Sequence, residues 1–388
     1  MAGYNTGDVI INTCVIGGVS LKGMFHSAKV SENMLNKIAG SAVTIKVLDT
    51  SDICEKIKPG APVYFAFSVP GGLMNTYNML VHSKQEIQDP GTNTMKSKMF
   101  DIHCVSREAI FAQAGRVEKK YTAPASSIVQ QVFTEYCRPT KGVRVSSSTG
   151  NPESWAGKDS PAKIINQMLQ RAVSPMGVFA WFENRDAFNF ITWQEAFSNA
   201  PLKNLKQHNT SGHDFLESRH DMILYHKVNK KGNASDALIG GQTKVIQYDT
   251  RSRKNEEKIY PGFVPSFMDA AFGAAISGIV TKIIRVPHAS KIGSQANRNM
   301  FFELLHKSTQ KIASLLQQTT TISVPGDTLL TVGKTVNLSI PKRMDVDSPS
   351  LDYELSGIHL IVTLDHVIHG PDAKPRYTTQ MQLIKDDI

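Results

Sequence analysis

The last sixty residues, Asp327 to Ile388, carry the clearest pattern of hydrophobic and polar positions in the chain. Apolar side chains alternate along residues 330–340 and again along 376–384, which is the two-residue period of a half-buried strand. Residues 355–368 form a long β-type run, and Gly370-Pro371-Asp372 is typical of a turn. We therefore predict an antiparallel β unit whose inward face carries Val336, Leu338, Ile340, Met381 and Leu383.

The same order of strands and turns recurs near the N-terminus. Residues 58–67 alternate, 77–83 form a second strand, and 98–105 alternate again after a turn at Asp89-Pro90-Gly91. The spacing of Gly60, Val63, Phe65 and Phe67 matches that of Gly333, Val336, Leu338 and Ile340, and Pro90, Phe100 and Ile102 match Pro371, Met381 and Leu383. Two unrelated β-meanders can share such alternation, but a repeat changes the whole fold prediction. We favour one β module present twice.

Between the two β units the pattern changes to an α/β insert. Residues 124–137 are apolar at helical spacing. Ser160 followed by Pro161 is a typical helix start, with a side-chain cap and then proline in the first turn. Residues 178–182 and 188–193 read as two aromatic strands around a hairpin turn at 184–186.

These patterns predict a mainly β chain with an α/β insert. We expect a first β-barrel domain in residues 1–118, completed by 198–237, an insert in 119–197, and a second β-barrel domain in 238–388. Residues 294–317 are the longest helical pattern, and 244–248 a further strand. Residues 251–258 are predicted as a polar loop, and 261–290 have no clear assignment.

Composition indicates a protein that folds without disulfides or metals. The chain has 388 residues, 41% of them hydrophobic and 20% charged, which is enough for several buried cores. Its four cysteines form no C-x-x-C pair, and this suits a reducing cytoplasm during synthesis. We expect no signal peptide and no membrane-spanning segment, because the most apolar stretch, 267–284, is interrupted by Asp269 and Lys282.

A net charge of +9 raises the possibility of nucleic-acid binding. The basic residues are scattered, however, and the densest group, which includes Arg251, Arg253 and Lys254, is half neutralised by its own glutamates. A solvated loop is therefore favoured over a phosphate-binding patch. DNA binding remains an alternative that rests on charge alone.

No catalytic constellation stands out in the sequence. The usual nucleophile, phosphate-loop and zinc-protease motifs are missing. His359, His366 and His369 cluster near Asp365 and could ligate a metal, but strand faces account for them better. Glu183 and Asp186 would be the carboxylates of a cell-wall hydrolase, although a hairpin tip is a poor place to shield one of them. We predict no enzyme activity and no cofactor, with the hydrolase kept as an alternative.

The chain resembles the baseplate hub, or tail hub, proteins of contractile-tailed phages, which are related to the N-terminal part of type VI secretion spike proteins. The resemblance covers nearly the whole chain and lies in the order of several weak motifs. They are Asp49-Thr-Ser-Asp-Ile-Cys-Glu-Lys-Ile-Lys-Pro-Gly60, the helix from Ala125 to Tyr136, Trp155, Val178-Phe-Ala-Trp-Phe182, Val324-Pro-Gly-Asp327 to Val336, and Leu364-Asp-His-Val-Ile-His369.

The resemblance implies a homotrimer in which each chain supplies two similar barrels to a ring of six. Such a ring would join the six-fold tail tube to the three-fold central spike in the virion baseplate. It would also enclose a channel for tape measure protein or for DNA during genome ejection. The implied partners are the chain itself, the tube protein and the spike protein. We expect contacts at Arg251, Arg253, Lys254, Asp372 and Lys374. A hub of a related contractile injection system is the second alternative.

Overall fold

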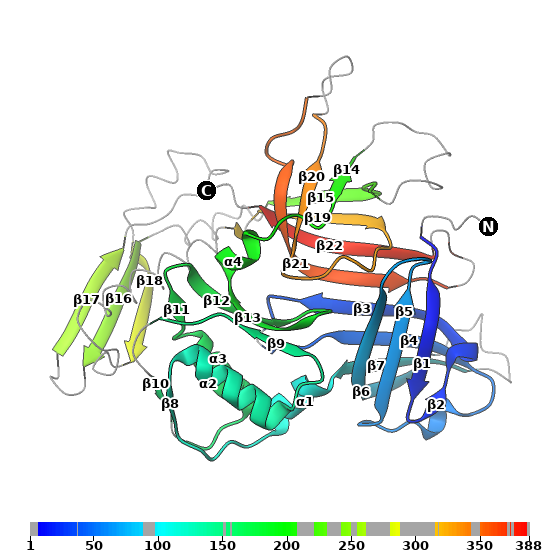
Figure 1. Ribbon diagram of the computed structural model, residues 1–388, viewed down its shortest axis with the longest axis horizontal. Coiled ribbons are helices and arrows are strands. Elements are labelled where there is room, and N and C mark those ends of the chain that lie inside the picture. The colour runs from blue at the N-terminus through cyan, green and yellow to red at the C-terminus, as the bar shows by residue number, and fades with distance from the viewer. Residues whose placement is uncertain are drawn as a thin grey trace.

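A large, mostly antiparallel sheet dominates the computed structural model of the protein (Figure 1). The structure describes residues 7–36, 38–87, 98–149, 153–155, 157–207, 221–230, 242–249, 254–260, 280–287, 315–316, 318–342, 350–370, 373 and 376–385. In the large sheet two groups of strands, here called the N-terminal and C-terminal modules, lie side by side. The prediction of a mainly β chain with an α/β insert is confirmed.

The N-terminal module has the strand order β3-β4-β7-β6-β5-β1, with the short β2 at its edge. Its strands are β1 (Ile10–Ile16), β2 (Val19–Ser20), β3 (Phe25–Asn33), β4 (Ala42–Asp49), β5 (Pro62–Ser68), β6 (Met74–Ile87) and β7 (Lys98–Ser106). Single 3-10 turns occur at Lys22–Met24 and Cys54–Lys56. The predicted inward side chains Val63, Phe65 and Phe67 are buried.

The C-terminal module repeats this order as β15-β19-β22-β21-β20-β14. Its strands are β14 (Asn204–Lys206), β15 (Tyr225–Lys230), β19 (Gln318–Pro325), β20 (Thr335–Ser339), β21 (Gly357–Ile368) and β22 (Tyr377–Lys385). Backbone hydrogen bonds of Lys206 with Asp221 and Ile223 close this module into a barrel. Residues 198–237 were expected to complete the first domain, but their strands β14 and β15 pair with β20 and β19 of the C-terminal module.

The two modules match at the level of single hydrogen bonds. Gly60 donates its N–H to the Val81 carbonyl at 2.8 Å, and Gly333 donates its N–H to the Ile361 carbonyl at 3.0 Å. Both glycines have a positive φ, 83° and 78°, which disfavours other residues. One extra residue follows Val81 in β6 and Ile361 in β21, so both strands carry a β-bulge at the same place.

This pairing corrects one detail of the predicted repeat. Val81 lies opposite Cys104, and Ile361 lies opposite Leu383, so Leu383 corresponds to Cys104 rather than to Ile102. The third strand is therefore shifted by two residues from the alignment that the turn prolines suggested. A two-residue shift keeps every side chain on its own face, which is why the hydrophobic pattern fitted both alignments.

The insert packs two helices against a four-stranded sheet of order β11-β12-β13-β9. Helix α1 (Arg107–Ala114) leads from β7 into the insert. The helices of the insert itself are α2 (Ala125–Val132), the π-helical turn η3 (Phe133–Cys137), α3 (Pro161–Leu169) and α4 (Trp193–Phe197). Its strands are β8 (Tyr121–Ala123), β9 (Gly142–Val145), β10 (Glu153–Trp155), β11 (Val173–Ser174), β12 (Gly177–Glu183) and β13 (Ala187–Thr192). The Ser160 hydroxyl accepts the Lys163 N–H, so the predicted helix cap is confirmed.

A separate three-stranded sheet of order β17-β16-β18 stands at one end of the molecule in Figure 1. It consists of β16 (Gln242–Asp249), β17 (Lys254–Tyr260) and β18 (Val280–Pro287). The prediction of a polar loop over 251–258 is wrong for its second half, because β17 pairs with β16 along its whole length. The predicted helix 294–317 lies outside the described residues, except for Leu315 and Leu316.

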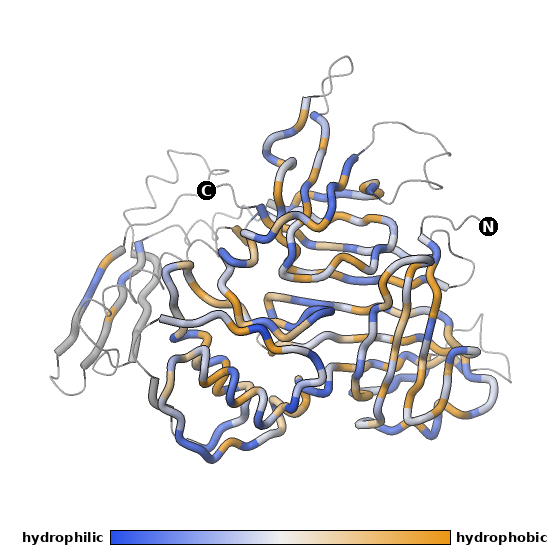
Figure 2. Tube along the Cα trace, in the orientation of Figure 1, coloured by the Kyte–Doolittle hydropathy of each residue, from blue (hydrophilic) through white to orange (hydrophobic). Residues whose placement is uncertain are grey.

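Three hydrophobic cores hold these parts together, one in each module and one in the insert. Figure 2 shows hydrophobic and hydrophilic positions alternating along the strands of both modules. The four cysteines, Cys14, Cys54, Cys104 and Cys137, are free and buried. In the described part of the chain, no helix combines the length and the hydropathy that crossing a membrane requires.

Candidate assembly interface between the two modules

The two modules join where β21 pairs with β3. The register places Asp365 opposite Ser31 and His366 opposite Val30 in an antiparallel ladder. On the solvent face, the Ser31 hydroxyl donates to the Asp365 carboxylate at 2.6 Å, and Lys29 lies 2.9 Å from its other oxygen. The Lys29–Asp365 pair is exposed, so it contributes about 1 kcal/mol or less to stability and serves mainly to specify the register.

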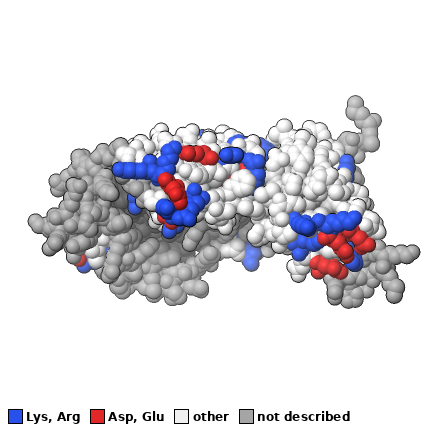
Figure 3. Space-filling view, turned by 90° about the horizontal axis from the view of Figure 1, so that it is seen from below, with Lys and Arg blue, Asp and Glu red and all other residues white. Residues whose placement is uncertain are grey.

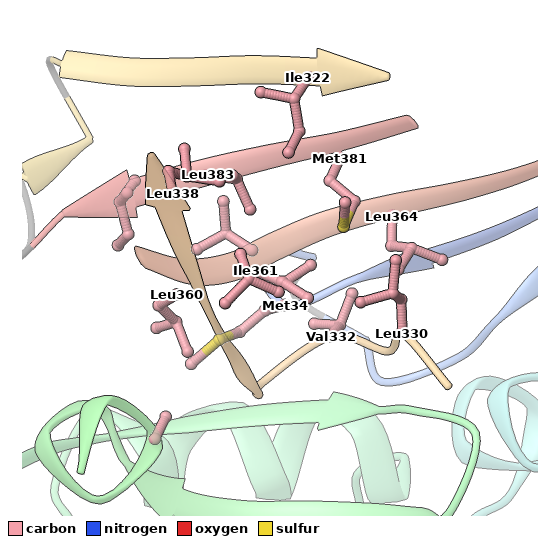
Figure 4. Close-up of a cluster of buried hydrophobic side chains, with 14 of the residues drawn as sticks. Met34, Ile322, Leu330, Val332, Leu338, Leu360, Ile361, Leu364, Met381 and Leu383 are labelled. Carbon is pink, nitrogen blue, oxygen red and sulfur yellow. The ribbon is translucent and has the colours of Figure 1, made fainter. Parts of the chain in front are cut away.

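Side chains cross the junction in both directions. Met34, at the end of β3, lies in the core of the C-terminal module beside Val332, Leu360 and Ile361 (Figure 4). Its backbone N–H donates to the Val362 carbonyl at 2.9 Å. In return, Ile368 and Tyr377 of the C-terminal module belong to the N-terminal core. Each module therefore completes its neighbour's core.

An aromatic cluster lies under this exchange. The rings of Phe67 and Tyr377 meet edge to face with centroids 5.6 Å apart, and the His366 ring lies 5.6 Å from Phe67. The Tyr377 hydroxyl and His366 Nδ1 are hydrogen-bonded at 2.7 Å. Burial lowers the pKa of His366 to about 3, because the charged imidazolium would lose its hydration there. His366 is consequently a neutral core residue at physiological pH.

Glu32 of β3 ties the loop before β20 to the junction. Its carboxylate accepts hydrogen bonds from the Thr331 hydroxyl at 2.6 Å and the Val332 N–H at 3.1 Å. Burial raises the pKa of Glu32 above its ordinary value, and these two hydrogen bonds oppose that rise. The fully buried carboxylate thus holds the C-terminal module against β3 through directional bonds.

The insert joins the same junction through its β12–β13 hairpin. Glu183 is buried, lies 2.7 Å from Lys141 Nζ, and accepts the Ser41 N–H at 2.7 Å as well as the Ser106 hydroxyl. Asn184 donates its side-chain N–H to the Val332 carbonyl at 3.0 Å. The hairpin therefore connects the N-terminal module with the loop that also meets Glu32.

The comparisons with known proteins bear on this architecture. No protein-family model matches the chain, and no curated protein matches it either. Among solved structures, the chain is similar to a tail protein from Neisseria meningitidis MC58, with a TM-score of 0.62, 11% identity, and coverage of 98% of this chain and 97% of that one. It is also similar to the 43 kDa tail protein of prophage MuSo2 from Shewanella oneidensis, with a TM-score of 0.57, 9% identity, and 97% of both chains covered.

The chain has the fold of these two tail proteins. The resemblance to tail hub proteins inferred from the sequence is confirmed at the level of the fold. The likeness covers 97% of each tail-protein chain, so both modules and the insert take part in it.

Most of the contact residues predicted from the sequence fall outside the described part of the tail-protein fold. Arg251, Arg253, Asp372 and Lys374 are not among the described residues. Lys254 begins β17, where it pairs in register with Asp249. Their role as contact residues stays a prediction.

The predicted metal-site candidates point in different directions. Asp365 faces solvent with Lys29, whereas His366, the next residue along β21, is fully buried against Tyr377. His369 lies 3.2 Å from the Thr378 hydroxyl. Within the described residues, no three histidine, cysteine or acidic side chains are grouped as metal ligands. The alternating faces of a strand separate Asp365 from His366.

The two carboxylates of the hydrolase alternative also have structural partners. Glu183 is enclosed by Lys141, Ser41 and Ser106, and Asp186 forms an exposed ion pair with Arg185 at 2.7 Å. A glycosidase needs two carboxylates facing one sugar-binding cleft. These two serve different contacts instead, one buried and one on the surface.

The basic excess does not form a uniform patch on the face seen in Figure 3. Lysine and arginine side chains there lie beside aspartate and glutamate side chains. Such mixed charge favours a solvated surface over a phosphate-binding one.

Sequence reasoning missed the strand that makes the junction. No element was predicted for residues 25–33, although Ala28 and Val30 alternate inward there. Glu32 occupies the next inward position, and a charged residue at a buried site conceals the pattern. The signal that could have found it is the inward alternation of Ala28 and Val30 together with the repeat, which requires a strand preceding β4.

Proposed function

We propose that this chain is the baseplate hub of a contractile phage tail, a homotrimeric adapter between the six-fold tail tube and the three-fold central spike. The observation that carries the proposal is the duplication of one module within the chain, with the same strand order and the same glycine hydrogen bonds in both copies. A three-fold object can present a near six-fold face only if each protomer carries the contact surface twice.

The role is structural rather than enzymatic. Two of the candidate side chains connect parts of the fold, since Glu183 joins the hairpin of the insert to the N-terminal module and His366 lies in the aromatic cluster between the modules. The similar tail proteins support a place in the virion tail. Synthesis in the host cytoplasm is a further part of the proposal. We include the tube protein and the spike protein as partners, and a central channel that passes tape measure protein and DNA.

The domain division forms part of the proposal. We take residues 1–118 as the first barrel domain, 119–197 as the insert and 238–388 as the second barrel domain, with β14 and β15 assigned to the second domain by their pairing. Contacts to tube or spike are proposed at Arg251, Arg253 and Lys254 and at the loop with Asp372 and Lys374.

The test is the mass of the protein in solution, measured by light scattering over a wide concentration range. The proposal predicts a species of three chain masses and a three-fold ring in electron micrographs. Purified tube and spike proteins should each bind this ring at opposite faces. A protein that stays monomeric or dimeric at high concentration, and forms no ring when tube or spike protein is added, would rule the proposal out.

The hydrolase alternative has its own measurement. Glu183→Ala and Asp186→Ala variants would be compared with the natural protein for clearance of purified cell wall. We expect no clearance by any of the three proteins. Clearance that disappears in either variant would make the chain an enzyme.

A further inference from the structure

The edge of β21 accepts two strands in succession. Its residues 357–360 pair with β20 of its own module, and after the bulge at Val362 its residues 363–368 pair with β3 of the other module. The bulge is the point at which the module ends and the neighbouring module begins. The edge of β21 beyond the bulge is thus where the C-terminal module pairs with the N-terminal module.

β6 has a bulge at the same place as β21, but among the strands that the structure describes only the part of its edge before the bulge is paired with another strand. Its residues 74–80 pair with β5 of its own module, and a bulge follows at His82. Beyond the bulge, residues 83–87 pair with β7 on one side. On the other side, no strand of the described residues pairs with them. Ser83, Gln85 and Glu86 are exposed along this stretch.

The strand that corresponds to β3 also has one unpaired edge. β15 pairs with β19 as β3 pairs with β4, and it is the end strand of the large sheet in the part of the chain that the structure describes. Tyr225 and Lys227 are exposed on it. Free edges of this kind invite pairing with another chain unless they are covered.

The two edges have matching registers. Val30 corresponds to Val228, because each pairs with the equivalent residue of the next strand, Val43 or Thr320. Ile361 precedes the bulge in β21, and Val81 precedes the bulge in β6. His366 lies five residues after Ile361 and Glu86 lies five residues after Val81, so these two residues correspond. The junction that pairs Val30 with His366 inside the chain therefore predicts a second junction that pairs Val228 with Glu86.

The polar chemistry of the solvent face is also compatible. The Ser31–Asp365 hydrogen bond of the internal junction would be replaced by an amide pair, Asn229 opposite Gln85. Lys227 takes the place of Lys29, diagonally beside Gln85. The second junction thus keeps a hydrogen-bonding pair and a cation but lacks the carboxylate that Asp365 supplies.

We propose that residues 83–87 of β6 pair antiparallel with β15 of a second copy of this chain, in the register that sets Gln85 opposite Asn229 and Glu86 opposite Val228. This contact deepens the proposed function and rests on it. Because β6 and β15 are different strands of one chain, the contact is heterologous and closes into a ring when three chains meet. Three internal and three intermolecular junctions of one kind then alternate around that ring.

Disulfide trapping tests the register directly. The double variant Gln85→Cys/Asn229→Cys is treated with diamide at a protein concentration where light scattering has given the mass. Opposite residues of an antiparallel pair have Cα atoms about 4.5–5.5 Å apart, which is within disulfide reach. The natural cysteines are buried and do not compete. We expect covalent bands on a non-reducing gel that stop at the trimer.

Two matched variants make the result specific. Ser31→Cys/Asp365→Cys carries the same pair at the internal junction and should form a disulfide within one chain, which shows that the geometry permits the bond. Gln85→Cys/Val228→Cys moves one cysteine to the other face of β15 and should give no cross-link. A mixture of the single variants Gln85→Cys and Asn229→Cys should give covalent dimers only.

Charge at position 85 gives a measurement without cysteines. Gln85→Glu restores the carboxylate that Asp365 supplies at the internal junction, so it should tighten the trimer beside Lys227. Gln85→Lys places two cations together and should raise the concentration of half-assembly on the order of tenfold, since the effect recurs at three junctions. Gln85 is exposed, so both variants should fold.

The outcomes separate this inference from the proposed function. A trimer by mass in which the Gln85→Cys/Asn229→Cys variant forms no cross-link between chains leaves the hub proposal standing and overturns the β6–β15 pairing. A ladder of bands beyond the trimer supports the pairing but contradicts closure at three chains. A species that is monomeric by mass under all conditions, with tube and spike proteins included, overturns both.

Discussion

A Cβ atom placed on Gly326 would lie 1.9 Å from Cδ1 of the Tyr377 ring. This distance is far shorter than any contact between two non-bonded carbon atoms. Tyr377 has crossed into the core of the N-terminal module, and the backbone at Gly326 packs directly on its ring. Tyr377 can therefore reach the N-terminal core only because residue 326 is a glycine.

Gly326→Ala should therefore destabilise the protein by about 1–3 kcal/mol, because the ring of Tyr377 must move within a packed core. Urea denaturation followed by tryptophan fluorescence would measure this change in the free energy of unfolding. Gly142→Ala is the matched control, since a Cβ there meets no atom within 4 Å. Equal effects of the two substitutions would contradict the packing argument.

Acid should weaken the protein through His366. Burial lowers the pKa of His366 to about 3 from an ordinary value of 6.5. Between these values the unfolded chain binds the proton and the folded chain does not, so the free energy of unfolding falls as the pH drops from about 6.5 toward 3. The loss from this residue is on the order of a few kcal/mol. Urea midpoints between pH 7 and pH 4 would measure it, and His366→Gln should show a shallower pH dependence than His82→Gln, an exposed control.

The titration of Glu32 should lower stability as the pH rises, which is the opposite of the effect of His366. Burial raises its pKa above the ordinary 4.5, so its contribution to stability is fully present below pH 4.5 and is lost as the pH rises through the folded-state value. Glu32→Gln, which keeps an oxygen acceptor for Thr331 and Val332, should remove this loss at high pH. Glu32→Ala should cost about 2–3 kcal/mol, because it leaves the buried Val332 N–H unpaired. Both would be measured by urea denaturation between pH 5 and pH 8, and a Glu32→Gln variant with an unchanged pH dependence would argue against a buried, titrating carboxyl.

The positive charge of Lys141 should be needed for stability, because it compensates the negative charge of the buried Glu183 carboxylate. Lys141→Met leaves a buried carboxylate without its cation, which typically costs about 3–5 kcal/mol. The double variant Lys141→Met/Glu183→Gln should recover a large part of this loss. Lys163→Met breaks the exposed pair with Asp159 and should change stability by less than about 1 kcal/mol. Thermal unfolding of the four proteins would distinguish a buried pair from a surface pair.

The strands that read clearly in the sequence are those with one purely apolar face. Val336, Leu338 and Ile340 are buried as predicted, and the helix start at Ser160 follows from local capping chemistry. Such features depend on neighbours along the chain. The repeat was visible for the same reason, since Gly60 and Gly333 both need a positive φ just before a strand.

The missed elements depend on partners far away in the sequence. β3 carries the buried Glu32, whose partners Thr331 and Val332 lie about three hundred residues away. β17 is rich in lysine and glutamate, and it becomes a strand only because β16 pairs with it. The register of β22 could not be derived from hydrophobicity, since a shift of two residues preserves the facing of every side chain.

The exchange of side chains between the modules also determines when the N-terminal core can form during synthesis. During synthesis, β3 and β5 leave the ribosome well before Ile368 and Tyr377, which fill the N-terminal core, have been made. The N-terminal module therefore cannot complete its packing until almost the whole chain has been translated. Chains that stop before Ile368 and Tyr377 lack two side chains of the N-terminal core, so this core stays incompletely packed in them.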